Sequence, residues 1–123
     1  MPNIDTARVV LPVRSQLEAY NAKDIDAFLK WWAPNCEYYS FPSTLLARGH
    51  DEIRLRHEER FREPDLHGYL HSRSVVGNLV VDCETVTRNF PEGKGEVDVI
   101  GLYEVEDDLI VRAWFKMGQM RLV

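Results

Sequence analysis

Cysteine is scarce in this sequence, and the pair that occurs shows no spacing typical of a metal site. Cys36 and Cys83 lie far apart in the chain, whereas zinc ligands recur within a few residues of one another. We therefore interpret both as buried, reduced thiols rather than as partners in a disulfide. His50, His67 and His71 have no ligand spacing either, and we expect neither a metal nor another cofactor.

The chain also lacks a long apolar run and an excess of basic residues. No stretch approaches the roughly 18 apolar residues that mark a membrane span, and no signal-peptide pattern is present. We expect a cytoplasmic protein without a membrane partner. The 15 Lys and Arg against 20 Asp and Glu give a net charge of −5, which repels phosphates and argues against a nucleic-acid partner. The mixed charges of residues 51–63 are interpreted as a solvated helix face.

What the sequence does contain is helical periodicity over its first half. Its 123 residues suit a single domain, 1–123. The first helix closes after Tyr20, and Pro12 leaves open whether it begins near residue 11 or continues through a kink. A second helix is expected over 25–33, where Pro34 would end it. A third is expected over about 50–62, with Ile53 and His57 on its inner face.

A period of two follows and predicts strands. A short aromatic strand is expected at 36–41, before the third helix. Longer strands are expected at 69–76, 79–90, 96–105 and 109–117, and the Gly77-Asn78 turn predicts an antiparallel meander. Helices grouped apart from a run of strands indicate the α+β class, with the helices on one face of the sheet.

The last strands are apolar on both faces. Val97, Val99 and Tyr103 share one face of a strand, and Ile100 and Leu102 share the other. Helices that cover only one face leave the second to be covered by something else. We therefore predict a homodimer through the outer face of the sheet.

Several stretches resemble one known superfamily. AYNAKDIDAFLKWWAPNCEYY, LLARGHDEIR and VDVIGLYEVEDDLIVRAWF are similar, in this order, to NTF2-like proteins, especially their SnoaL-like and ketosteroid-isomerase-like members. The resemblance covers nearly the whole chain. It implies a curved, mainly antiparallel sheet wrapped around three N-terminal helices to form a cone, and dimers through the outer sheet face. This scaffold hosts isomerases, cyclases, dehydratases, epoxide hydrolases and non-enzymatic binders, so it does not decide the function.

The resemblance also implies which side chains enter the cone. Adjacent strand residues point to opposite sides, and the alignment places Tyr38, not Tyr39, inside. Whether the 82–88 face with Glu84 also turns inward stays open, because such polar residues are rarely buried unpaired. The expected ligand-binding residues are Gln16, Trp32, Tyr38, Arg88, Val99, Tyr103, Phe115 and Met117.

The residues that perform steroid isomerisation in ketosteroid isomerases are absent. The position of their oxyanion-binding tyrosine holds Gln16, and that of their second acid holds Gly101. Their catalytic base falls on Ser40 or Phe41. The resemblance therefore implies the same fold with a different site.

His57 is the leading candidate for chemistry. Histidine titrates near neutral pH, so in an apolar cone it can act as acid, base or donor. The expected catalytic residues are His57, Tyr20 and Glu84, with Tyr20 or Tyr38 and Glu84 orienting the imidazole. Cofactor-independent catalysis on a small apolar molecule, of isomerase, dehydratase or cyclase type, is one hypothesis. The alternatives are a core histidine and a non-catalytic ligand-binding or interaction domain; the sequence does not decide between them.

Overall fold

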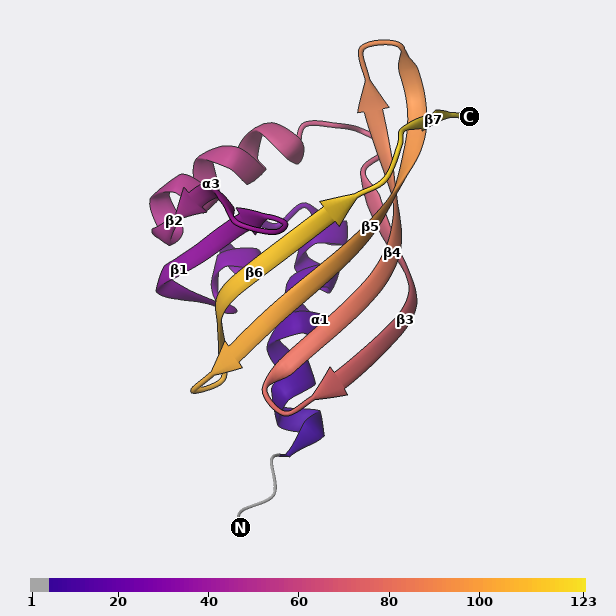
Figure 1. Cartoon of the computed structure of the whole chain (residues 1–123). Coiled ribbons are helices and arrows are strands. Elements are labelled where there is room, and N and C mark those ends of the chain that lie inside the picture. Colours follow the sequence, from indigo (N-terminus) through magenta and orange to yellow (C-terminus); the bar gives the residue numbers. More distant parts are fainter. Residues whose placement is uncertain (1–4) are drawn as a thin grey trace.

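The computed structural model describes residues 5–123, in which three helices lie on one side of a curved sheet (Figure 1). The elements, in chain order, are α1 (Thr6–Ala22), α2 (Ile25–Leu29), β1 (Trp32–Ser40), β2 (Thr44–Arg48), α3 (Gly49–Arg60), β3 (His67–Val76), β4 (Leu79–Phe90), β5 (Gly93–Glu106), β6 (Leu109–Met117) and β7 (Arg121–Leu122).

The strands form one sheet in the order β2-β1-β6-β5-β4-β3, and β7 pairs with β5. The predicted meander is confirmed, because β3, β4, β5 and β6 pair consecutively and antiparallel. Only the β1–β6 pair among these ladders is parallel. Register shifts in β3 and β5 are the kind of irregularity that bends a sheet. The α+β fold predicted from the sequence is therefore confirmed.

Helix α1 begins earlier than residue 11, so a start at Leu11 is wrong. The Asp5 side chain caps the helix by accepting from the Arg8 amide, which satisfies an otherwise free donor of the first turn. The helix runs through Pro12, whose ring is buried against the core. It ends at Lys23, whose left-handed backbone (φ 57°) lets its N–H reach the carbonyls of Ala19 and Tyr20.

The second helix is shorter than predicted, and Pro34 does not end it. Helix α2 stops at Leu29, and Trp32 already belongs to β1. The Ile110 amide donates to the Trp31 carbonyl, which draws the chain into the sheet. Pro34 lies in β1 where the register with β6 is interrupted, so its missing N–H breaks no ladder bond. Strand β2 was not predicted.

The core fills the space between the helices and the inner face of the sheet. Phe28, Ile53, Ile110 and Val13 are among its most buried side chains. Cys36 is also buried, as predicted, but Cys83 is only half-buried on the outer face. Both thiols are free.

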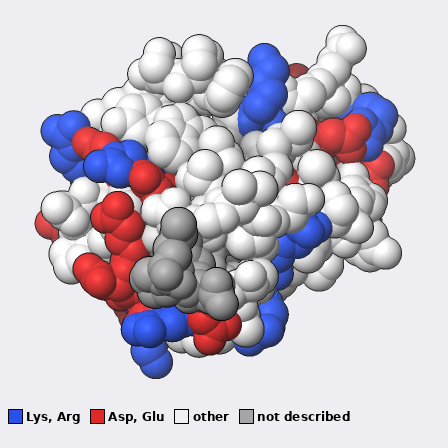
Figure 2. Space-filling view, turned by 60° about the horizontal axis from the view of Figure 1, so that its bottom comes forward, with Lys and Arg blue, Asp and Glu red and all other residues white. Residues whose placement is uncertain are grey.

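The outer face of the sheet carries large side chains without a cover. Tyr39 of β1 and Trp114 of β6 stack with ring centroids 5.8 Å apart. Ile100 of β5 is 49% exposed on the same face. Elsewhere, Figure 2 shows acidic and basic side chains in mixed groups separated by uncharged surface, consistent with the modest net charge. Within residues 5–123, no helix has both the length and the hydropathy to cross a membrane.

Candidate active site

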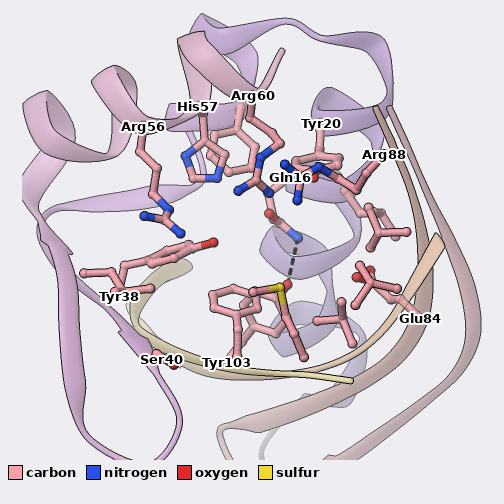
Figure 3. Close-up of a pocket in the computed structure, with 18 of the residues that line it drawn as sticks. Gln16, Tyr20, Tyr38, Ser40, Arg56, His57, Arg60, Glu84, Arg88 and Tyr103 are labelled. Atoms are coloured by element: carbon pink, nitrogen blue, oxygen red, sulfur yellow. Dashed lines mark hydrogen bonds between the residues drawn. The ribbon is translucent and has the colours of Figure 1, made fainter. Parts of the chain in front are cut away.

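A cavity of about 80 Å³ lies between the helices and the concave side of the sheet (Figure 3). All three helices and strands β1, β2, β4, β5 and β6 contribute to its lining. Leu46 and Met117 line it and are exposed, so its mouth lies beside them. Sites that enclose drug-sized ligands measure roughly 300–1,000 Å³. This cavity therefore accommodates about one small ring, and a larger ligand would extend through the mouth.

The structure brings every residue predicted for the site to this cavity. These residues are Gln16, Tyr20, Trp32, Tyr38, His57, Glu84, Arg88, Val99, Tyr103, Phe115 and Met117. Tyr38 faces inward, while Tyr39 packs on the outer face. Trp32 reaches the cavity from a strand rather than from a helix.

The question of which β4 face turns inward is answered by burial. Asp82 and Glu84 are buried, whereas Val81 and Cys83 between them are only partly so. Asp82 does not line the cavity. Its carboxylate accepts two hydrogen bonds from Arg73, at 2.7 and 2.9 Å, so this buried charge is paired, as burial requires.

Glu84 differs from its neighbour because it is buried without a matching cation. Glu84 is only 8% exposed, and its Oε2 has no hydrogen-bond partner among residues 5–123. Burial, followed by the charge of Asp82, raises the pKa of Glu84 to about 7, against a smaller opposing effect of Arg73. A substantial fraction of Glu84 is thus an uncharged carboxyl group at neutral pH, able to donate a proton.

His57 is held by the backbone of its own helix. Its Nδ1 lies 2.9 Å from the Ile53 carbonyl oxygen, which can only accept, so Nδ1 carries the proton and Nε2 is an acceptor. Burial, and then the charges of Arg60 and Arg56, lower the pKa of His57 to about 4, although the Ile53 bond opposes this. The expectation that a tyrosine or Glu84 orients the ring is wrong, since Ile53 does so.

Tyr103 fills the space that a side chain at position 101 would need. A Cβ built on Gly101 would lie 3.1 Å from Tyr103 Oη, and the Gln16 amide donates to that oxygen at 3.4 Å (Figure 3). Burial, then the charges of Glu84 and Asp82, raise the pKa of Tyr103 well above its ordinary value. The hydroxyl therefore stays protonated and available as a donor.

Trp32 and Tyr20 add two further polar groups to the walls. Trp32 is almost fully buried, yet its Nε1–H has no acceptor among the described residues. Burial raises the pKa of Tyr20 to about 12, so this phenol is also uncharged. Buried donors are rarely left unpaired in proteins. An oxygen atom on a ligand would satisfy the indole N–H.

Two arginines of the site were missed from the sequence. Arg56 and Arg60 line the cavity from α3, although residues 51–63 were interpreted as a solvated face. The signal was present, because Arg56 lies three residues after Ile53 and Arg60 three residues after His57, and residues at this spacing share a side of a helix. Arg88 donates twice to Glu63, both at 2.8 Å, and this partner was also not foreseen.

Two of the remaining histidines, His50 and His71, have partners outside the cavity. Nε2 of His50 lies 2.7 Å from the Trp32 carbonyl, and that of His71 lies 2.6 Å from the Thr85 hydroxyl. In the described part of the chain, no three His, Cys, Asp or Glu side chains gather as a metal site would need.

Comparison with known families decides the relationship. The profile of the SnoaL-like domain matches residues 13–113. The chain belongs to the SnoaL-like family. Comparison of this SnoaL-like domain with functionally curated proteins gives no match.

Several solved structures share the fold of this chain. A cystatin-fold protein from Novosphingobium aromaticivorans is 24% identical with a TM-score of 0.80, over 87% of this chain and 96% of that one. An LEH-like epoxide hydrolase from M. tuberculosis is 16% identical with a TM-score of 0.77, over 92% and 84%. A SnoaL-like polyketide cyclase candidate from Jannaschia sp. CCS1 is 14% identical with a TM-score of 0.78, over 95% and 91%. At these identities the likeness establishes the fold alone.

Proposed function

We propose that this SnoaL-like domain binds a small, largely apolar molecule with a carbonyl or hydroxyl group and catalyses an acid–base reaction on it. Isomerisation, dehydration and cyclisation are reaction types whose bond changes acid–base groups can catalyse without a redox partner. The observation that carries the proposal is that two buried titratable groups, His57 and Glu84, line one cavity. Figure 3 shows them on opposite sides of it, so a ligand would lie between them.

The two groups suit complementary roles. Nε2 of His57 has a free lone pair and accepts a proton from the ligand. Glu84 in its protonated form gives a proton to a ligand oxygen as negative charge develops there, and a return transfer restores both groups. The Tyr103 hydroxyl and the Trp32 N–H add donors that stabilise the same oxygen. Tyr20 and Tyr38 pack around the imidazole, with ring centroids 6.3 and 5.6 Å from it, and exclude water.

The relatives give independent but weaker support. The names of an epoxide hydrolase and a polyketide cyclase candidate describe reactions that rely on acid–base groups in the same kind of fold. Such analogy raises the expectation of an enzyme without naming its substrate.

A direct test does not require the natural substrate. Small cyclic ketones and enones would be incubated with the protein in deuterium oxide. NMR would then measure how fast the hydrogens next to the carbonyl are replaced by deuterium. We expect exchange above the buffer rate, reduced roughly a hundredfold or more in Glu84→Gln and His57→Ala. A matched control is Leu55→Ala, which removes an exposed side chain of α3 away from the cavity. Exchange at the buffer rate for every compound would contradict the proposal.

One observation favours a non-catalytic binding protein instead. The Nδ1 of His57 bonds to a backbone carbonyl rather than to a carboxylate, and a histidine with a pKa of about 4 is a weak base. In that case the compounds would bind without exchange, and Glu84→Gln would change affinity only.

The proposal includes a homodimer through the outer sheet face. Ile100 and the stacked Tyr39–Trp114 pair form an uncovered surface there. Exposed apolar patches rimmed by charge are typical of protein interfaces. Arg112 and Glu37 beside the stack supply such a rim.

A further inference from the structure

Two like charges of one helix turn toward the cavity. Arg56 and Arg60 stand four residues apart on α3, and both line the cavity on either side of His57 (Figure 3). Like charges at this spacing repel one another and destabilise a helix, and their approach to apolar walls adds to that cost. The pair is therefore not explained by the stability of α3.

The Arg56 guanidinium has no carboxylate partner in the described part of the chain, since no ion pair or hydrogen bond links it to one. It lies 5.3 Å from the centre of the Tyr38 ring instead. By contrast Arg54, two residues earlier, pairs with Asp26 at 2.7 Å and with Glu58 at 3.6 Å. Arg54 on the solvent side of α3 thus has two carboxylate partners, whereas Arg56 on the cavity side has none among the described residues.

Arg60 is only partly compensated. Its sole carboxylate neighbour among residues 5–123 is Glu63, at 3.7 Å. Glu63 already accepts two hydrogen bonds of 2.8 Å from Arg88. Two guanidinium groups, those of Arg60 and Arg88, therefore share one carboxylate, and Arg56, which lines the same cavity, has none among the described residues. This local surplus of positive charge lies in a chain whose overall net charge is −5.

Such a surplus fits one ligand chemistry. A guanidinium group presents a planar fork of donors that matches a carboxylate, and bonds between two charged groups are the stronger ones. The rest of the lining, with Val97, Val99 and Phe115, is apolar. We infer that the cavity selects small carboxylic acids, whose carboxylate lies between Arg56 and Arg60 and whose apolar body enters the cavity. This inference rests on the proposed function, because it names the ligand class of the same site.

The inference has a consequence for His57. The charges of Arg60 and Arg56 both contribute to the lowered pKa of the imidazole. A bound carboxylate would offset them and raise that pKa, so the acid would improve the base that acts on it.

The test compares two probes of nearly the same shape, the anion phenylacetate and the neutral phenylacetamide, titrated against the protein with NMR detection. We expect the acid to bind about tenfold tighter than the amide, because roughly one charge-assisted hydrogen bond contributes this much to the affinity. Arg56→Gln and Arg60→Gln should remove this preference while keeping the amide affinity, which also shows that each variant is folded. Arg54→Gln, on the solvent side of α3, is the matched control and should retain the preference.

The outcomes separate the two proposals. Equal affinity for acid and amide, or an unchanged preference in Arg56→Gln, would overturn the carboxylate inference and leave ligand binding by the cavity intact. If the wild-type protein shows no deuterium exchange but still binds the acid more tightly than the amide, the result would overturn catalysis and support the carboxylate site. Binding of neither probe at millimolar concentration would overturn the carboxylate inference together with the cavity's role as a ligand site.

Discussion

The ring of Tyr103 lies over Gly101, so close that a Cβ on residue 101 would be 2.9 Å from the ring carbon Cε2. These two residues belong together, because the missing side chain of one makes room for the phenol of the other. The resemblance to ketosteroid isomerases puts an acid at position 101. Here the hydroxyl beside that position comes from Tyr103.

This relationship predicts a packing penalty for Gly101→Ala. The added methyl group meets the stiff part of an aromatic ring rather than a flexible end, so the ring must move. We expect a loss of about 1–3 kcal/mol in the free energy of unfolding, measured by urea denaturation. In a Tyr103→Ala background the same change should cost much less. An equal loss of stability from Gly101→Ala in the two backgrounds would show that the Tyr103 ring is not what excludes a side chain at residue 101.

The pH dependence of activity follows from the two uncharged groups. The base His57 is active above its pKa of about 4, and the acid Glu84 is active below its pKa of about 7. The kcat/KM of the wild-type protein for a compound found in the exchange screen should therefore be bell-shaped between these values. The fall near pH 7 should disappear in Glu84→Gln. If kcat/KM still falls near pH 7 in Glu84→Gln, the fall is due to the titration of another group.

Glu84 also predicts how stability depends on pH. Its pKa is raised from 4.5 to about 7 by folding, so the folded state holds a proton that the unfolded state releases. The native state therefore loses stability as pH rises from about 4.5 to 7, by about 3 kcal/mol in all. Glu84→Gln should be more stable relative to wild type at pH 8 than at pH 4, in denaturant titrations. A difference independent of pH would contradict the shift.

The pKa of Glu84 depends on the charges of the Asp82–Arg73 ion pair. Asp82 raises the pKa of Glu84, whereas Arg73 lowers it. Replacing Asp82 by Asn removes the first charge and retains the second. We expect the Glu84 pKa to fall in Asp82→Asn, as seen by NMR titration of isotope-labelled Glu side chains. A pKa that stays at the wild-type value would leave burial as the only cause.

The homodimer is tested at Ile100. A charge placed there, in Ile100→Glu, would have to be buried in the proposed interface and should halve the mass measured by sedimentation. Leu55→Glu is the matched control, because Leu55 is 74% exposed on α3, away from the sheet. A wild-type protein that sediments as a monomer would contradict the dimer.

The sequence predicted best where a pattern has a single reading. Strand β4 has the predicted bounds, because strict alternation follows a Gly-Asn turn. Tyr38 was placed inward by the resemblance, and period-two geometry then placed Tyr39 on the other face. His57 followed from helical spacing with Ile53.

Prediction failed where tertiary contacts override local preference. Trp32 continues a helical pattern, but pairing with β6 makes it the first residue of β1. Arg56 and Arg60 were assigned to solvent because mixed charges at short spacing are typical of a solvated helix face. The charge pattern was given more weight there than position, although Arg56 and Arg60 follow the inner residues Ile53 and His57 by three residues each.

The central claim is that two uncharged titratable groups face one cavity, and direct titration of both by NMR tests it without a substrate. The account predicts that the His57 imidazole titrates near 4 and the Glu84 carboxyl near 7. A histidine that titrates near 6.5 and a glutamate near 4.5, their ordinary values, would mean that water reaches both groups, and would contradict the proposed acid–base pair.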